Sequence, residues 1–149
     1  MKEPVVADST CLIGLERIGR PDILPSLFDP ITIPPRVHLE FGTDLPWLHV
    51  AAPADQPLVT TLKMLLGDGE AEAIALACEH GSRIILDDRQ ARSVAQHLGL
   101  SVIGTVGILI RAKRSGIVPS LKRILGELEA KGFYVSDALI EEALRLVGE

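Results

Sequence analysis

Short apolar runs recur along the first two-thirds of the chain and predict the strands of a sheet. Continuous apolar runs of this length are typical of strands buried on both faces, as in a parallel sheet. Glycine, proline and charged residues separate them, which favours turns or helix starts between the strands. The predicted strands cover residues 5–7, 31–33, 48–52, 84–86 and 100–104.

Between these runs, the apolar residues follow a helical spacing. Ala91, Val94, Ala95 and Leu98 fall on one face of a helix, and Gly99 follows as a C-terminal stop signal. Similar segments continue to the end of the chain, beyond the last predicted strand. The predicted helices cover residues 11–18, 21–27, 36–41, 58–66, 70–80, 89–98, 105–113, 120–131 and 137–147.

The alternation of strands and helices up to about residue 113 indicates the fold class. It predicts an α/β protein with three α/β/α layers, in which helices cover both faces of a central, mainly parallel sheet. The remaining residues add C-terminal helices. The sequence shows no internal repeat, low-complexity segment or linker, so we expect one domain over residues 1–149.

Acidic residues directly follow two of the predicted strands. Asp8 ends the first strand, and the pair Asp87-Asp88 ends the strand at 84–86. Ligands of open α/β sheets bind at the carboxyl ends of the strands, and adjacent acids repel unless a cation or a basic neighbour offsets them. These positions predict a metal site built from carboxylates far apart in sequence. Helix capping by Asp8 is the structural alternative.

Two further segments carry acids whose simplest interpretation is structural. Gly67-Asp68-Gly69 reads as a tight turn that opens a helix, and acids in its first turn complement the helix dipole. Glu40 lies in a short, weakly patterned helix, where a solvated surface position is the usual fate of a lone glutamate.

Composition limits the classes of function. Hydrophobic residues make up 47% of the 149 residues and aromatics only 3%, so we expect an aliphatic core. A net charge of -5 argues against general coating of nucleic acid. No apolar run reaches the roughly 18 residues of a membrane span, and no signal-peptide core follows Met1. Cys11 and Cys78 lie in apolar helical contexts and are predicted to be reduced, so we expect a cytoplasmic protein.

Common catalytic and binding signatures are absent from the sequence. It has no P-loop, dinucleotide-binding glycine motif, zinc-type histidine spacing or nucleophile elbow. A dehalogenase-like phosphatase would need a second acid where Thr10 stands. A receiver domain would place its acidic pair after the first strand. Carboxylate chemistry therefore remains.

The motifs together resemble the PIN-domain family, specifically its VapC-type toxin branch. The matching segments span nearly the whole chain, and their order and spacing are more specific than any one of them. They are residues 5–10, 37–40, 69–77, 85–92 and 102–109.

The resemblance implies a metal-dependent nuclease that acts on RNA, with three or four acids around Mg²⁺ or Mn²⁺. A gapless count favours Glu70 over Glu72 as the third acid and Asp88 over Asp87 as the fourth, and both members of the latter pair are retained. The implied catalytic acids are Asp8, Glu40, Glu70 and Asp88, and the implied metal ligands are the same four together with Asp87.

Other residues receive supporting roles from the same resemblance. A hydroxyl of Ser9 or Thr10 would support the first acid or its metal-bound water. Arg89 and Arg92, directly after the acidic pair, are the candidate RNA-binding cations, with a solvated helix face as the alternative.

The toxin branch also implies partners: a small antitoxin protein and a second copy of the chain in a homodimer, with no membrane. The alternative function is a catalytically inactive PIN-fold module that binds RNA or protein.

Overall fold

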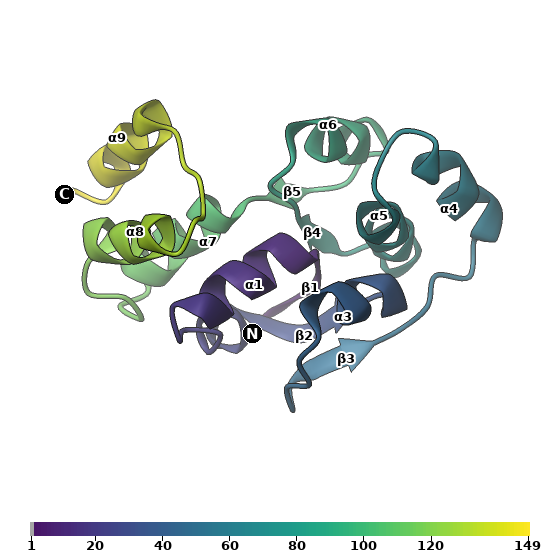
Figure 1. Cartoon of the computed structure of the whole chain (residues 1–149), viewed down its shortest axis with the longest axis horizontal. Helices are drawn as coiled ribbons and strands as arrows, with labels where there is room; N and C mark the ends of the chain where they lie inside the picture. Colours follow the sequence, from purple (N-terminus) through teal and green to yellow (C-terminus); the bar gives the residue numbers. More distant parts are fainter. Residues whose placement is uncertain (1) are drawn as a thin grey trace.

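The apolar runs form one parallel sheet in the computed structural model, which describes residues 2–149 (Figure 1). The order of the strands is β3-β2-β1-β4-β5. In the centre of the sheet, Val6 of β1 lies opposite Thr32 of β2 and Ile84 of β4. The strands are β1 (Glu3–Ala7), β2 (Phe28–Ile33), β3 (Leu48–Val50), β4 (Arg83–Ile85) and β5 (Val102–Ile103).

The strand order reverses between β1 and β4. The chain builds outward from β1 through β2 to β3, and then crosses to β4 on the other side of β1. In open α/β sheets, ligands bind outside the carboxyl ends of the strands where the order reverses in this way. Asp8 and Asp87-Asp88 follow β1 and β4, so the topology brings the predicted acids to one edge of the sheet.

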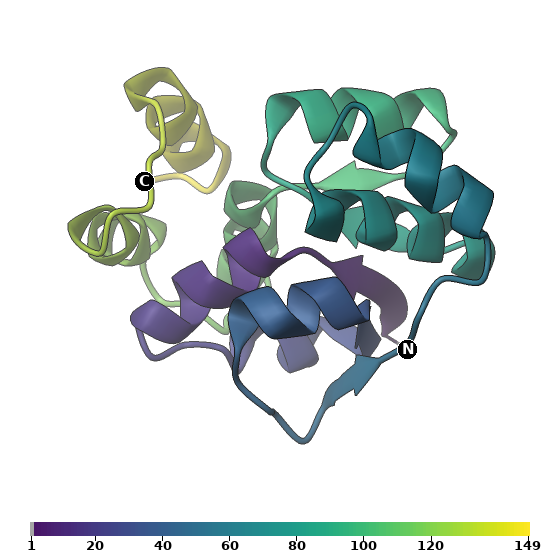
Figure 2. The same cartoon turned by 45° about the vertical axis from the view of Figure 1, so that its right-hand side comes forward.

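Helices cover both faces of the sheet, as Figures 1 and 2 show, which confirms the predicted three-layer α/β/α class. The loop glycines Gly42 and Gly81 end their helices in the left-handed conformation, with φ of 75° and 61°. The helices are α1 (Ser9–Arg17), α2 (Ile23–Leu27), α3 (Pro35–Phe41), α4 (Gln56–Lys63), α5 (Asp68–His80), α6 (Arg89–His97), α7 (Thr105–Arg114), α8 (Leu121–Ala130) and α9 (Asp137–Leu146).

The start of α5 differs from the sequence prediction. The segment read as a turn before residue 70 is already helical, and Gly67 is the N-cap. Gly69 is buried in this first turn, and its missing side chain lets the helix approach α3. The glycine therefore marks a close contact between two helices.

The core is aliphatic, as the composition predicts. Ile84 and Ile85 of β4 and Val6 of β1 have no exposed surface, and α5 contributes Ala73 and Ala77. Small residues on α5 allow it to pack closely against β1 and β4, which it contacts directly. Both cysteines are free thiols, in agreement with the sequence.

The C-terminal helices form one end of the molecule (Figure 1), where α8 contacts α1, α7 and α9. The apolar face of α8 is buried, whereas Leu139 and Leu146 of α9 are 46% and 43% exposed. Within residues 2–149, no helix is long and apolar enough to cross a membrane.

Candidate functional site

Asp8 occupies the centre of the acidic edge. Its backbone N–H donates to the carbonyl of Ile85, 3.2 Å away, which ties the end of β1 to β4. The residue is the N-cap of α1 by position, but its side chain makes no capping hydrogen bond. Only 5% of the residue is exposed. Capping thus does not account for a carboxylate at this buried position.

The environment of Asp8 disfavours its charged form. Burial is the largest cause and raises the pKa of its carboxyl from 3.8 to about 7, although the backbone N–H of Ser9 acts in the opposite direction. The nearby negative charges of Glu70, Glu40 and Asp87 are smaller causes that contribute to the same raised pKa. Three of the four acids that the resemblance groups with Asp8, namely Glu40, Glu70 and Asp87, are therefore close enough to repel it.

Glu40 reaches the site from α3. The hydroxyl of Ser9 donates to Glu40 Oε1 at 3.1 Å, and Arg36 Nε lies 3.7 Å from Glu40 Oε2. The resemblance implies that a hydroxyl of Ser9 or Thr10 supports the first acid or its metal-bound water, and in the structure the Ser9 hydroxyl donates to the second acid. The difference arises because α1 begins beside α3, and the two helices are in contact. Thr10 is exposed.

Gly69 leaves room for the Glu40 carboxylate to lie against α5. It was not recognised as a site residue from the sequence. A Cβ atom built on Gly69 would overlap Glu40 Oε1 and would lie 3.0 Å from Glu40 Cδ. Any side chain here would displace the carboxylate. The available sequence signal was a glycine immediately before an acid in a helix that is otherwise rich in alanine.

Glu70 follows in the same turn of α5. Burial, Asp88 and Glu40 raise the pKa of its carboxyl, and the backbone N–H of Gly67 acts in the opposite direction. Glu72, the other candidate, accepts the backbone N–H of Arg36 at 3.3 Å instead. The contacts favour Glu70 as the member of the cluster.

Asp87 and Asp88 have different partners. Asp87 accepts the backbone N–H of Thr105 at 2.9 Å and its hydroxyl at 2.6 Å. Asp88 Oδ2 accepts the backbone N–H of Ala91 at 3.0 Å and caps α6. The negative charge of Asp87 raises the pKa of Asp8, whereas the negative charge of Asp88 raises the pKa of Glu70. Both acids thus border the cluster, and they are held separately: Asp87 by two hydrogen bonds from Thr105 and Asp88 by one from Ala91.

Thr105 is the second residue that the sequence analysis did not single out. It is fully buried, begins α7 directly after β5 and Gly104, and presents both donors to one carboxylate. The signal that could have identified Thr105 in the sequence is a hydroxyl residue directly after the strand next to β4.

The donor set fits a hard divalent cation. Carboxylate oxygens are the ligands that Mg²⁺ and Mn²⁺ prefer, and a cation would favour the charged form of Asp8, which burial and the neighbouring acids disfavour. Within residues 2–149, no three His, Cys, Asp or Glu side chains converge closely enough to enclose a metal ion. Mg²⁺ keeps several waters and needs only one or two direct carboxylates, so such a cage is not required.

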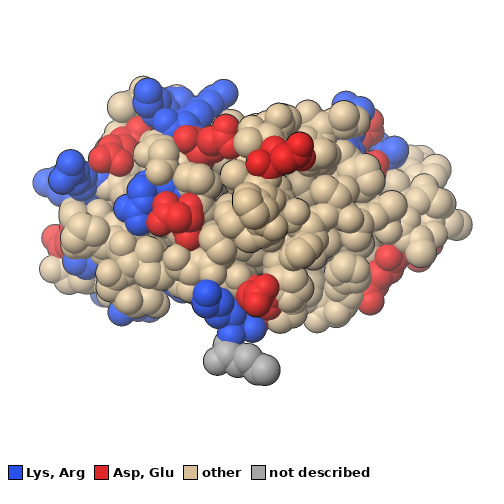
Figure 3. Space-filling model, turned by 90° about the horizontal axis from the view of Figure 1, so that it is seen from below, with Lys and Arg blue, Asp and Glu red and all other residues tan. Residues whose placement is uncertain are grey.

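The two predicted RNA-binding arginines differ in how they are held. Arg92 is half-buried and donates from Nη1 to the carbonyl of Leu86 at 3.0 Å, so it ties α6 to the end of β4. Arg89 is exposed, with no ion pair or side-chain hydrogen bond among residues 2–149. On the face in Figure 3, most Lys and Arg side chains lie toward the end formed by the C-terminal helices.

The sheet is parallel, its strand order reverses between β1 and β4, and carboxylates lie together at that reversal. These features define an α/β protein with an acidic site at the carboxyl ends of its strands. The profile of the PIN-domain family matches residues 4–149, and the chain therefore belongs to this family. PIN domains are generally nucleases that act on RNA with divalent metal ions.

A solved structure supports the fold. The chain is similar to a PilT N-terminus domain protein from the hyperthermophilic archaeon Sulfolobus solfataricus P2, with 21% identity and a TM-score of 0.56. The similarity covers 73% of this chain and 92% of that protein, and at this identity it shows the fold alone. No curated protein sequence matches the chain.

Proposed function

We propose that this protein is a divalent-metal-dependent endoribonuclease that hydrolyses RNA phosphodiester bonds. One observation carries the proposal: Asp8 is buried at the carboxyl end of β1, and the charges of Glu40, Glu70 and Asp87 help to raise its pKa to about 7. Strained clusters of titratable groups occur preferentially at functional sites. Membership of the PIN family supports the same chemistry.

The acids of the site would hold the metal ion and accept a proton. Asp8, Glu40 and Glu70 would hold Mg²⁺ or Mn²⁺, with Asp87 or Asp88 as the fourth acid. When bound, the cation lowers the pKa of a water and offsets negative charge on the phosphodiester. Glu70, whose pKa is raised, is suited to accept a proton from the attacking water when it is not itself a ligand.

Two contacts orient this machinery. The hydroxyl of Ser9 fixes one oxygen of Glu40, and the two donors of Thr105 fix Asp87. Preorganised carboxylates reduce the rearrangement that catalysis would otherwise require. Among residues 2–149, Arg89 makes neither an ion pair nor a side-chain hydrogen bond, and its place beside the acidic pair suits it to attract a phosphate.

The biological setting belongs to the proposal as well. We infer a toxin of a VapBC-type pair that acts in the cytoplasm, with a small antitoxin protein as partner and a homodimer as the assembly. The motifs shared with the VapC-type branch support this inference. Light scattering of the purified chain tests the homodimer, which we expect at about twice the mass of 16.0 kDa.

Calorimetric titration with Mn²⁺ or Mg²⁺ tests the nuclease, with cleavage of mixed single-stranded RNA assayed on the same samples. Asp8→Asn keeps the size of the side chain and removes its charge, so metal binding and cleavage should both collapse. Glu129→Gln is the control, because Glu129 is an exposed acid on α8. Its metal binding and cleavage should match those of the wild type.

The second candidate is a PIN-fold module that binds RNA or protein without cleaving RNA. The absence of three converging metal-ligating side chains among the described residues favours this candidate. A wild-type protein that binds no divalent metal and cuts no RNA would establish it and would contradict the nuclease.

A further inference from the structure

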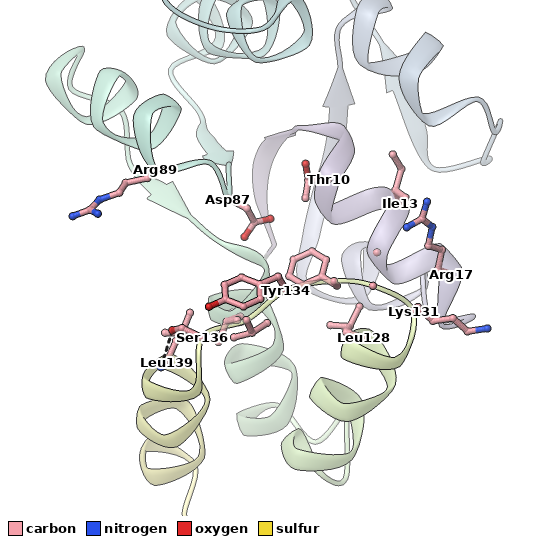
Figure 4. A pocket seen from close by; sticks show the side chains of 15 residues that line it. Thr10, Ile13, Arg17, Asp87, Arg89, Leu128, Lys131, Tyr134, Ser136 and Leu139 are labelled. Carbon is pink, nitrogen blue, oxygen red and sulfur yellow. Dashed lines mark hydrogen bonds between the residues drawn. The ribbon is translucent and has the colours of Figure 1, made fainter.

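A groove runs from the acidic site toward the C-terminal helices. It has a volume of about 830 Å³ and lies between α1, the start of α7 and the segment that joins α8 to α9 (Figure 4). Asp87 lines its end nearest the acids, and apolar side chains such as Ile13, Val106 and Leu128 line its interior. We refer to this feature as the C-terminal groove.

The wall of the C-terminal groove is built by a close contact. Gly14 of α1 faces Phe133, and a Cβ built on Gly14 would lie 3.0 Å from the ring. The absent side chain lets the Phe133 ring pack against α1. The next residue, Tyr134, then points outward and is 85% exposed. An aromatic ring with this exposure has lost the burial that normally stabilises it.

Cations gather around the same groove without protein partners. Among residues 2–149, five Lys or Arg side chains make neither an ion pair nor a hydrogen bond, and three of them line the groove. Figure 4 shows Arg89 on one side of Tyr134 and Arg17 and Lys131 on the other. The five are Arg17, Lys63, Arg89, Lys122 and Lys131. In a protein with a net charge of -5, this clustering indicates an anionic ligand.

We propose that the C-terminal groove binds the single-stranded nucleic acid on one side of the cleaved bond, with a base stacked on Tyr134 and phosphates at Arg17 and Lys131. This inference rests on the proposed nuclease function, because the groove leads to Asp87. Aromatic platforms combined with cations that follow the backbone are the usual means of binding single strands without sequence preference.

The position of the groove favours nucleic acid over an acidic peptide. Both ligands would be attracted by Arg17 and Lys131. Only a nucleic acid has a flat, apolar face at every residue for Tyr134, together with a phosphodiester that must reach the acids beside Asp87.

The stacking contact is tested with fluorescein-labelled single-stranded RNA by fluorescence anisotropy, in an Asp8→Asn background that prevents cleavage. Tyr134→Ala should raise the Kd about tenfold, and Tyr134→Phe should leave it within about twofold, because the ring is retained. Tyr134 is exposed, so neither change should alter the fold.

The phosphate contacts are tested by the salt dependence of the same Kd. Arg17→Gln or Lys131→Gln should each reduce the slope of log K against log salt by about 0.7, the value for one phosphate of a single strand. Lys63→Gln and Lys122→Gln are matched controls, because these cations are also unpaired but lie outside the groove. Their slopes should equal that of the parent.

The outcomes separate this inference from the proposed function. If the groove variants lose affinity while the wild type cuts no RNA, the groove stands and the nuclease fails. If the wild type cuts RNA but Tyr134→Ala and Arg17→Gln bind like the controls, the nuclease stands and the groove is not the path of the strand. If RNA fails to bind while a poly-glutamate peptide binds through Arg17 and Lys131, the groove binds protein and the inference is wrong.

Discussion

Glu40 depends on its neighbours for its place in the acidic site. Its carboxylate accepts a hydrogen bond from the hydroxyl of Ser9 and lies directly against Gly69 of α5. The Glu40 side chain is flexible, so an intrusion at Gly69 would move the carboxylate without moving the backbone. The residue contacts therefore allow the site to be disturbed separately from the fold.

We expect Gly69→Ala to weaken metal binding and RNA cleavage by about 10- to 100-fold, the range seen when a supporting contact of a metal ligand is lost. The free energy of unfolding should change by less than about 1 kcal/mol. The backbone stays in place, and the gain in helix propensity from glycine to alanine is itself no more than about 1 kcal/mol. Chemical denaturation and calorimetry measure the two effects.

Gly126→Ala is the matched control for this change. Gly126 lies in α8, and a Cβ there would meet nothing within 4 Å. The variant should keep full cleavage and gain the same helix propensity. Equal cleavage by the Gly69→Ala and Gly126→Ala variants would show that Glu40 does not serve the site.

Asp88 combines a cap with a charge, and the two can be separated. Asparagine is as good an N-cap as aspartate, so Asp88→Asn should retain stability, whereas Asp88→Ala should lose about 1 kcal/mol. If Asp88 is the fourth acid, both variants should lose at least about tenfold in RNA cleavage. Wild-type cleavage by Asp88→Asn would leave Asp88 as a cap and assign the fourth position to Asp87.

The identities of the acids were more predictable than their partners. Asp8 and the acidic pair follow apolar strands, and parallel strands present their carboxyl ends at one edge, so the sequence places them together. The partner of Ser9 depends on how α1 packs beside α3, which no local pattern encodes. The choice between Asp87 and Asp88 depends on a single residue of register at the end of β4.

At the scale of elements, α7 begins where Asp87 needs its donors. The helix has Gly104 as its N-cap, and its first residue, Thr105, gives both its N–H and its hydroxyl to the carboxylate. A carboxylate at this end also complements the helix dipole. The helix, and not only the loop after β4, thereby sets the position of Asp87.

Thr105→Val keeps the shape of this buried side chain and removes the hydroxyl. We expect a loss of about 1.5–3 kcal/mol in the free energy of unfolding, as for a hydrogen bond to a charged group. In an Asp87→Asn background the same change should cost less, and urea denaturation of the two single variants and the double variant measures the difference. Additive losses would show that the two side chains are not coupled.

The elements themselves were largely predictable, because most have a clear period and a clear stop signal. The segment predicted as a helix at 120–131 is α8, whose apolar face is buried, and Ser136 caps α9 in the structure. The start of α5 was missed because Asp68 and Gly69 are typical turn residues. Packing against α3 overrides that local preference.

At the scale of the whole molecule, the strand order gathers acids from α3, α5 and the loop after β4 around one buried carboxylate. Charges from distant parts of the chain are thus forced together by folding and separate on unfolding. The fold consequently bears a cost that a bound cation would relieve, and global stability should depend on pH and on metal.

The direction of that dependence follows from the pKa of Asp8, which is about 7 in the folded chain and near 3.8 in the unfolded chain. Between these values the folded state holds a proton that the unfolded state has released, so the stability contributed by protonated Asp8 falls as pH rises and is lost above about pH 7. Relative to the wild type in EDTA, Asp8→Asn should become more stable by on the order of 3 kcal/mol between pH 4 and pH 8. Millimolar Mg²⁺ or Mn²⁺ should stabilise the wild type at pH 8 and leave Asp8→Asn unchanged. Urea denaturation at both pH values measures these free energies of unfolding. If the stability of Asp8→Asn followed that of the wild type at both pH values, Asp8 would be ionised in the folded protein without a bound cation.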